Sequence, residues 1–371
     1  MGPVLPNRLG RSLALPSAAG PRDIPMPPRS FVSVIIPVRN SPDTLPDCLL
    51  ALERQSVPSD QYEVIVVDDG STDDTATVAS ECGAQVISIA QCGPGAARNR
   101  GVEVAKGDLI LFTDADCAPD AEWIRSMTEP FDDAEVAATK GVYRTEQTSW
   151  TARLVQAEYE SRYRLMQSRD SIDFIDTYSA GYRCSVFEDA GGFDESFPVP
   201  CVEDQELGFR LAKMGCRMVF CPRAVVAHRH ASDPVSYFRK KVKIAYWKMK
   251  VLVRYPDKAI SDSHTPSSLK AEIVLTALTI ASLPVAAVAS IWWLPLVFFG
   301  SFLATCAPFC GVLLFGSPAL AISAPLFLTL RSVALGVGMV LGILGRPMRS
   351  GGREKRMQQA TEASQRIEEH A

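Results

Sequence analysis

The stretch Asp108-Leu109-Ile110-Leu111-Phe112-Thr113-Asp114-Ala115-Asp116 joins a short apolar run to two aspartates, Asp114 and Asp116. The continuous apolar run over 108–113 predicts a strand that is buried on both faces. Two carboxylates at the end of a buried strand are costly unless a cation holds them, and a divalent metal is the usual cation. An open α/β fold holds phosphorylated ligands at this edge of its sheet. The alternative is an acidic turn exposed to solvent.

The residues around this stretch alternate between strand and helix patterns. Strands are predicted over 31–38, 62–67, 84–89 and 108–113, with helices over 43–55, 73–81 and 95–106 between them. This order and spacing are typical of βαβ units, so the fold class is α/β with a mostly parallel sheet flanked by helices. Further along we expect helices over 123–131, 150–167 and 203–214, and strands over 136–143, 217–221 and 224–228.

Charge and cysteine content exclude several classes of protein. The chain has 38 basic and 42 acidic residues, a formal net charge of -4. A duplex-binding protein normally carries a basic surplus, so no nucleic-acid partner is expected. The ten cysteines include no CxxC pair, which argues against a zinc site and against a disulfide framework. The soluble part is therefore expected in a reducing, cytoplasmic compartment.

The C-terminal third of the chain is apolar. Residues 273–344 contain a single charged side chain, Arg331. This tract is more than twice the ~20 residues that a membrane helix needs, so 271–345 is predicted to be a membrane region. Residues 233–258 alternate basic and aromatic side chains, which suits a helix lying on an anionic leaflet, with membrane lipid as a partner. The juxtamembrane segment is accordingly placed at 233–270.

Charge around the membrane region predicts its topology. Spans are expected over 273–293 and 294–315, whereas Arg331 would cost ~3 kcal/mol or more in the middle of a third span over 319–344. Basic residues flank both ends of the tract, in 239–258 and in the charged tail 346–371. If both ends are cytoplasmic, the number of spans is even. We therefore predict a two-span hairpin in the inner membrane with 319–344 interfacial or re-entrant; three spans are the alternative.

Residues 1–30 are rich in Pro, Ala, Ser and Gly and lack the apolar core of a signal peptide. They are predicted to be a disordered leader. The domain that precedes the membrane region is accordingly placed at 31–232.

Two further polar groups follow predicted strands or open a predicted helix. Asp68 and Asp69 come directly after the second strand, where they can accept hydrogen bonds from a nucleobase or from ribose hydroxyls; the alternative is a capped turn. Arg98 lies at the start of the helix over 95–106, where it can face phosphate or the acidic site. Arg98 also stands where a dinucleotide fingerprint needs its third glycine, which argues against such a site. The alternative is a plain helix start.

Glu203 and Asp204 open a helix, where carboxylates can act as simple helix-dipole partners. The functional alternative is a general base, because transfer to a hydroxyl requires that hydroxyl to lose its proton. His228 ends a strand. It can complete a metal site with the predicted carboxylates or touch diphosphate, or it can be structural.

Six motifs, taken in order, resemble those of the family 2 glycosyltransferases, which have the GT-A fold. They are Val34-Ile35-Ile36-Pro37-Val38-Arg39-Asn40, Val66-Val67-Asp68-Asp69-Gly70-Ser71-Thr72-Asp73, Ala97-Arg98-Asn99-Arg100-Gly101, Phe112-Thr113-Asp114-Ala115-Asp116, Gly191-Gly192-Phe193-Asp194-Glu195 and Glu203-Asp204-Gln205-Glu206-Leu207-Gly208-Phe209-Arg210-Leu211. Each motif is weak alone, and their order and spacing make the set specific.

The resemblance implies a site for a nucleotide sugar donor. Asp68 or Asp69 would contact the nucleoside, with Pro37 and Asn40 at the same wall. Asp114 and Asp116 would be the DxD pair that binds Mn²⁺ or Mg²⁺ and through it the diphosphate. Arg98 on the donor side and His228 as a third metal ligand complete the expected donor site.

The resemblance also implies the reaction. Asp204 would be the base of an inverting, in-line displacement, with Glu203 on the acceptor side. The QxxRW motif of processive synthases is absent after His230, so a hexosyltransferase that adds a single sugar is expected. The membrane region favours a lipid-linked or membrane-proximal acceptor at the cytoplasmic face. The alternative is a non-catalytic, membrane-bound protein that binds nucleotide sugars or serves as a scaffold.

Overall fold

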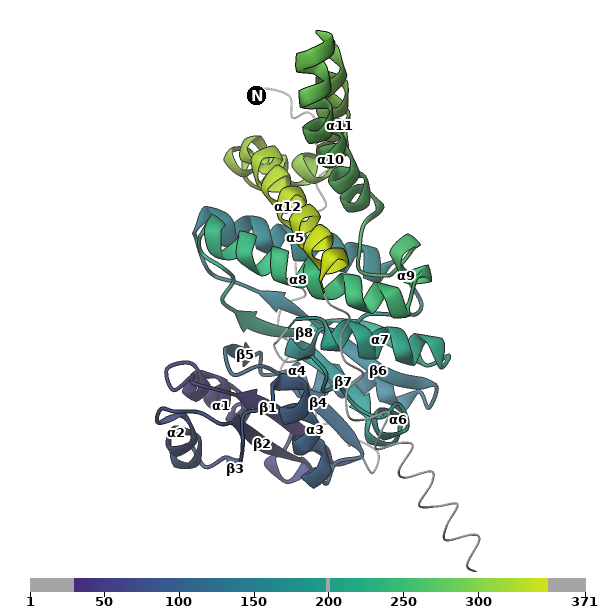
Figure 1. The fold of residues 1–371 in the computed structure, drawn as a ribbon. Helices are drawn as coiled ribbons and strands as arrows, with labels where there is room; N and C mark the ends of the chain where they lie inside the picture. The colour runs from purple at the N-terminus through teal and green to yellow at the C-terminus, as the bar shows by residue number, and fades with distance from the viewer. Residues whose placement is uncertain (1–29, 198–200, 346–371) are drawn as a thin grey trace, which may run out of the picture.

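The computed structural model describes residues 30–197 and 201–345, so nearly all of the predicted leader and the whole charged tail lie outside the described residues. One eight-stranded sheet, in the order β3-β2-β1-β4-β7-β6-β8-β5, forms the centre of the domain that precedes the apolar helices. Helices cover the sheet, and a bundle of apolar helices extends from one end of the molecule (Figure 1).

The first half of the sheet confirms the predicted βαβ pattern. Strands β1 (Val32–Val38), β2 (Tyr62–Asp69), β3 (Gln85–Ile89) and β4 (Leu109–Phe112) pair in parallel, with α1 (Leu45–Glu53), α2 (Thr75–Glu81) and α3 (Pro94–Val104) between them. The register pairs Val38 with Asp68 and Ile35 with Phe112. The loops after β1, β2 and β4 therefore leave the sheet at the same edge, which is where the candidate site lies.

The second half of the sheet is mixed. Strand β7 (Ala180–Arg183) pairs antiparallel with β4 and with β6 (Val136–Arg144), and β8 (Arg217–His228) pairs parallel with β6 and antiparallel with β5 (Cys117–Pro119). The two strands predicted over 217–221 and 224–228 are one strand, β8. It continues past Pro222 because a register irregularity opposite Val142 of β6 absorbs the break.

The remaining elements of this domain surround the mixed half of the sheet. They are α4 (Trp123–Thr128), α5 (Trp150–Gln167), α6 (Cys184–Asp189), α7 (Glu203–Lys213) and the 3₁₀ turns η1 (Ser59–Gln61), η2 (Glu129–Asp132) and η3 (Thr177–Ser179). Strands β5 and β7 were not predicted, because three or four residues are too few to show a period.

The core has one apolar layer on each face of the sheet. Along β1, Val34 and Ile36 belong to one layer and Ile35 to the other, as the alternation of side chains in a strand requires. Trp123 of α4 fills the first layer, and Phe193 packs edge-on against Phe112 in the second. Burial on both faces explains why this strand reads as a continuous apolar run.

Five helices form the C-terminal part: α8 (Pro234–Arg254), α9 (Asp257–Ile260), α10 (Ser267–Ala289), α11 (Trp293–Gly316) and α12 (Pro318–Leu344). Among the described residues, α10, α11 and α12 are long and apolar enough to cross a membrane. Figure 1 shows α10 and α11 extending together away from the sheet, whereas α12 lies across α8. Small residues permit this contact, since a Cβ on Gly338 would collide with the Val242 carbonyl of α8.

Candidate donor site and acceptor cavity

A pocket of about 480 Å³ lies at the shared edge of β1, β2 and β4. Six residues singled out from the sequence line it: Pro37, Asn40, Asp69, Arg98, Asp114 and Asp116. They come from the ends of β1 and β2, from the loops after β1 and β4, and from α3, and the parallel pairing of the strands brings these segments together. Asp68, Glu203, Asp204 and His228 do not line this pocket.

Two of the loops that form the pocket are joined by the side chain of Asn40. Its Oδ1 accepts from the Thr72 backbone amide at 2.9 Å, and the backbone amide of Asn40 donates to Ser71 Oγ at 3.0 Å. Asn40 has φ +52°, a left-handed conformation that asparagine tolerates better than most residues. Asp68 accepts from the Ser71 amide at 3.0 Å, so it shapes the turn instead of facing the pocket.

Asp69 holds the loop that leads into α3. Its Oδ2 accepts from the Gly93 amide at 3.0 Å, and its Oδ1 accepts from the Cys92 amide at 2.6 Å. The Cys92 thiol also donates to Oδ1, at 3.4 Å, so it is Oδ2 that retains a lone pair to accept from a ligand in the pocket.

Arg98 connects this pocket of about 480 Å³ to the start of α7. Its guanidinium is 3% exposed; Nη2 donates to Asp114 Oδ1 at 2.8 Å, and Nη1 donates to Glu203 Oε1 at 3.1 Å. Glu203 Oε2 also accepts from the Cys201 amide at 2.9 Å. The buried carboxylate of Glu203 is thus paired with Arg98, and it does not line the second cavity, which Asp204 lines.

Asp116 and His228 lie close enough together to share a cation. His228 Nδ1 is 3.5 Å from Asp116 Oδ1, and Tyr143 stacks on the imidazole with ring centroids 4.4 Å apart. Cys117 lies in the same cluster, in which the ligand atoms are all within 4.8 Å of one another. No sequence motif pointed to this cysteine.

The chemistry of the cluster suits a hard divalent cation bound by oxygen and imidazole. Burial, together with the charges of Asp114 and Asp116, raises the pKa of Cys117 well above its ordinary value. Sulfur is also a softer ligand than carboxylate oxygen or imidazole nitrogen. Asp114 Oδ1 is paired with Arg98, whereas no described residue donates to its Oδ2. Asp116 and His228 therefore offer ligands that suit Mn²⁺ or Mg²⁺, whereas Asp114 is paired with Arg98 and is not part of this cluster.

Asp204 lies in the first turn of α7, beside Glu203 but facing a different space. It lines a cavity of about 210 Å³ between α7, α8, α10 and α12. Burial raises the pKa of Asp204 well above its ordinary value, and the negative charges of Glu203 and Asp176 add to the effect. A raised pKa makes this carboxylate a stronger base than an exposed aspartate.

The cavity next to Asp204 is cationic on one side and apolar on the other. Its charged lining consists of Arg162, Lys241, Lys248, Lys258 and Lys270 together with Asp176, Asp204 and Asp262. The apolar lining includes Ile244 and Leu252 of α8 and Leu335 and Met339 of α12. None of these residues except Asp204 was singled out from the sequence as a site residue, because the lining comes from elements far apart in the chain.

Comparison with known proteins agrees with this architecture. Residues 33–191 match the family model described as Glycosyl transferase family 2. The chain is 31% identical over 261 residues to the pre-mycofactocin glycosyltransferase of Mycobacterium tuberculosis, covering 67% of this chain and 53% of that protein. It is 35% identical over 173 residues to glycosyltransferase AglE of Haloferax volcanii, covering 44% of this chain and 56% of that protein. The chain thus spans about half the length of these two relatives.

A solved structure shows the same fold. The mannosyltransferase PcManGT from Pyrobaculum calidifontis, in complex with GDP-Man and Mn²⁺, aligns with TM-score 0.56 over 85% of this chain and 87% of that chain, at 20% sequence identity. This likeness confirms the predicted GT-A fold.

Proposed function

Since residues 33–191 form a domain of glycosyl transferase family 2, we propose that this protein transfers a single hexosyl group from a nucleotide diphosphate sugar to an acceptor hydroxyl. The observation that carries the proposal is the pocket of about 480 Å³ in which Pro37, Asn40, Asp69, Arg98, Asp114 and Asp116 meet. This set offers hydrogen-bond acceptors at one end, for a nucleoside, and a cation with two carboxylates at the other, for a metal-bound diphosphate.

The metal is proposed to be Mn²⁺ or Mg²⁺. Asp116 and His228 would hold it, and when bound it supplies positive charge to the departing diphosphate. Arg98 adds a fixed positive charge on the same side. Its two ion pairs keep Asp114 in place without metal, so the carboxylate is oriented in advance of ligand binding.

Asp204 is proposed as the base of an inverting displacement. It follows Glu203, which Arg98 ties to Asp114 of the donor pocket. The carboxylate lines the second cavity, and its chain neighbour Glu203 provides the link to the donor pocket. An acceptor hydroxyl entering from that cavity can give its proton to Asp204 while it attacks the anomeric carbon from the face opposite the diphosphate.

A lipid-linked or membrane-proximal acceptor fits the second cavity. Its lysines and Arg162 suit an anionic head, and its apolar side is formed by α8 and by helices of the membrane region. The acceptor would then stay in the leaflet while its head reaches Asp204.

The protein is proposed to sit at the cytoplasmic face of the inner membrane as a two-span hairpin of α10 and α11. In its most apolar window α12 is 39% buried inside the protein, compared with 17% for α10 and 11% for α11. A helix that packs on α8 to this extent has less surface left for lipid. It therefore suits the predicted interfacial position of 319–344.

Replacement of Asp204 by asparagine tests the proposal. Loss of a general base should lower transfer about 10²–10⁴-fold, whereas thermal stabilisation by the nucleotide sugar and Mn²⁺ should persist because the donor pocket is intact. The donor is first identified by scoring a panel of nucleotide sugars in the same stabilisation assay, with and without EDTA. Asp132→Asn, an exposed carboxylate of η2, serves as the control. Near-normal turnover by Asp204→Asn would show that the base is assigned wrongly.

A further inference from the structure

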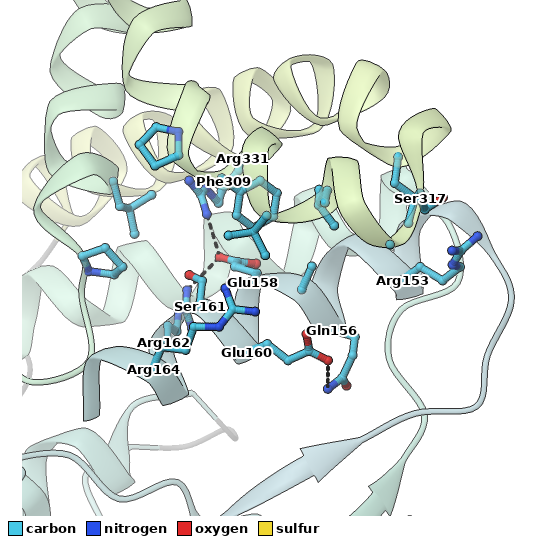
Figure 2. Close-up of a pocket in the computed structure, with 18 of the residues that line it drawn as sticks. Arg153, Gln156, Glu158, Glu160, Ser161, Arg162, Arg164, Phe309, Ser317 and Arg331 are labelled. Carbon is cyan, nitrogen blue, oxygen red and sulfur yellow. Dashed lines mark hydrogen bonds and ion pairs between the residues drawn. The ribbon is translucent and has the colours of Figure 1, made fainter. Parts of the chain in front are cut away.

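A cavity of about 600 Å³ lies where the catalytic domain meets the apolar helices (Figure 2). Helix α5 forms its polar wall, and α10, α11 and α12 form the others. It contains no residue of the donor pocket and does not include Asp204. The glycosyl transfer proposed above gives this cavity no role.

One face of α5 supplies charges of both signs to the cavity. Arg153, Glu160 and Arg164 are seven and four positions apart, so they share a helix face, and all three side chains are exposed. Within the part of the chain that the structure describes, neither Arg153 nor Arg164 has a carboxylate partner. Glu146, which precedes α5, adds an exposed carboxylate to the same lining.

Arg331 lies at the inner end of the cavity, and one of its N–H groups donates to no described residue. Arg331 of α12 is 6% exposed and pairs with Glu272 and, at 3.3 Å, with Glu158. Its Nε–H finds no acceptor among the described residues. A buried donor normally has an oxygen partner, so the inner end of this cavity is short of one acceptor.

The wall formed by α11 is apolar, and it continues onto the outer surface of that helix. Pro308, Phe309, Val312 and Leu313 line the cavity, and Val312 is 48% exposed. Because α11 is the least buried of the three apolar helices, its surface faces the region where lipid chains would lie. The cavity therefore suits an amphiphile whose head lies against α5 and whose tail follows α11.

We infer that this cavity binds a zwitterionic phospholipid with a primary ammonium headgroup, its phosphate against Arg164 and its ammonium against Glu160, about one helical turn away on α5. The charged lining is balanced, with the arginines 153, 162, 164 and 331 facing the glutamates 146, 158, 160 and 272. A headgroup of net negative charge would leave the exposed glutamates without a partner and repel them.

The bound lipid is not the acceptor. Arg162 and Leu269 line both this cavity and the one beside Asp204, so an occupant here fixes one wall of the acceptor cavity without reaching the base. Binding of a phospholipid in this cavity depends on its own lining and does not require sugar transfer in the donor pocket.

Native mass spectrometry of the full chain in detergent tests the inference. Phosphatidylethanolamine, phosphatidylglycerol and phosphatidylcholine with the same acyl chains are titrated in parallel. Phosphatidylethanolamine should bind about tenfold more tightly than the other two, the effect of one additional charge-assisted pair. Phosphatidylcholine shares the phosphate but has no N–H to donate, and phosphatidylglycerol has no cation.

Variants locate the binding. The variant R164A should weaken binding of phosphatidylethanolamine about tenfold or more, and E160Q should reduce its preference over phosphatidylglycerol. R54A, an exposed arginine after α1, is the control. An unchanged unfolding temperature in lipid-free detergent would show that each variant is folded. Equal binding of the three lipids, unchanged affinity of R164A, or full displacement by inorganic phosphate would each overturn the inference.

Discussion

Arg331 of α12 donates to Glu158 of α5 at 3.3 Å, although 173 positions separate them in the chain. The same carboxylate accepts from Lys241 at 3.0 Å and from Arg162 at 2.7 Å, and Tyr237 donates to its other oxygen at 3.1 Å. One buried glutamate therefore joins the catalytic domain, α8 and the last apolar helix. It also explains how a charged residue is accommodated within an apolar helix.

Glu158→Gln should destabilise the folded protein strongly. Removing one partner of a buried ion network leaves the others uncompensated, at a cost of about 3–5 kcal/mol. Thermal unfolding in lipid-free detergent measures the effect, and Glu160→Gln, an exposed glutamate two positions on, should be nearly neutral. An equal shift in the two variants would contradict the role assigned to Glu158.

The pH dependence of transfer should show an acid limb set by Asp204. Burial and the charge of Glu203 raise the pKa of Asp204, and a base acts only when deprotonated, so kcat/KM should fall as pH drops through that raised pKa. Glu203→Gln removes one of the charges that raise it. The acid limb should then move to lower pH, and a pH–rate profile of both proteins measures the shift; an unmoved limb argues against Asp204 as the titrating base.

Arg98→Lys should impair donor use although charge is conserved. A lysine cannot donate to Asp114 and Glu203 at once with the planar fork of a guanidinium. We expect a fall in kcat/KM of about 10²-fold or more, as for loss of one member of a buried pair. Steady-state kinetics with varied donor measure it, with Arg100→Lys as the control, since Arg100 pairs only with the exposed Glu103. Equal kinetics for the two variants would be contrary to this prediction.

Gly338→Ala should separate α12 from α8. A Cβ at this position would meet the carbonyl oxygen of Val242 and the side chain of Ala245, whereas one on Gly336 meets nothing within 4 Å. Overpacking of this kind costs about 1–3 kcal/mol. Gly336→Ala is therefore a control on the same helix, and the difference in unfolding temperature between the two variants is the measurement. No difference would indicate that α12 does not pack on α8.

A tag placed after α12 should be cytoplasmic if α10 and α11 form a two-span hairpin. Protease accessibility in spheroplasts and in inverted vesicles distinguishes the two sides: the tag should be protected in spheroplasts and cleaved in inverted vesicles. A tag placed between α10 and α11 should behave in the opposite way and serves as the control. Cleavage of the C-terminal tag in spheroplasts would instead favour three spans.

The donor pocket was largely predictable because its residues follow strand ends. Pro37, Asn40, Asp69, Asp114 and Asp116 each belong to a short local motif at or just after the end of a buried strand, and parallel pairing brings these strand ends to one edge. Asp68 is an exception. Asp68 differs from Asp69 by one position, and the alternation of side chains along the strand turns it toward the Ser71 turn.

The rest of the site depends on pairs that no local pattern encodes. Arg98 meets Glu203 across 105 positions, and Cys117 meets His228 across 111. Strand β8 was predicted as two pieces because Pro222 interrupts its sequence, and only pairing with β6 makes it continuous.

By itself, the sequence determined the parallel half of the sheet, the residues that meet in the pocket of about 480 Å³ and the apolar tract, because each follows from short-range periodicity and from the order of motifs along the chain. Only the tertiary structure decided that Arg98 joins Asp114 to Glu203, that Asp204 faces a separate cavity, and that Arg331 is neutralised by Glu158 and Glu272. The physical reason is that burying a charge requires a partner of opposite sign, and packing of distant elements chooses which residue that partner is.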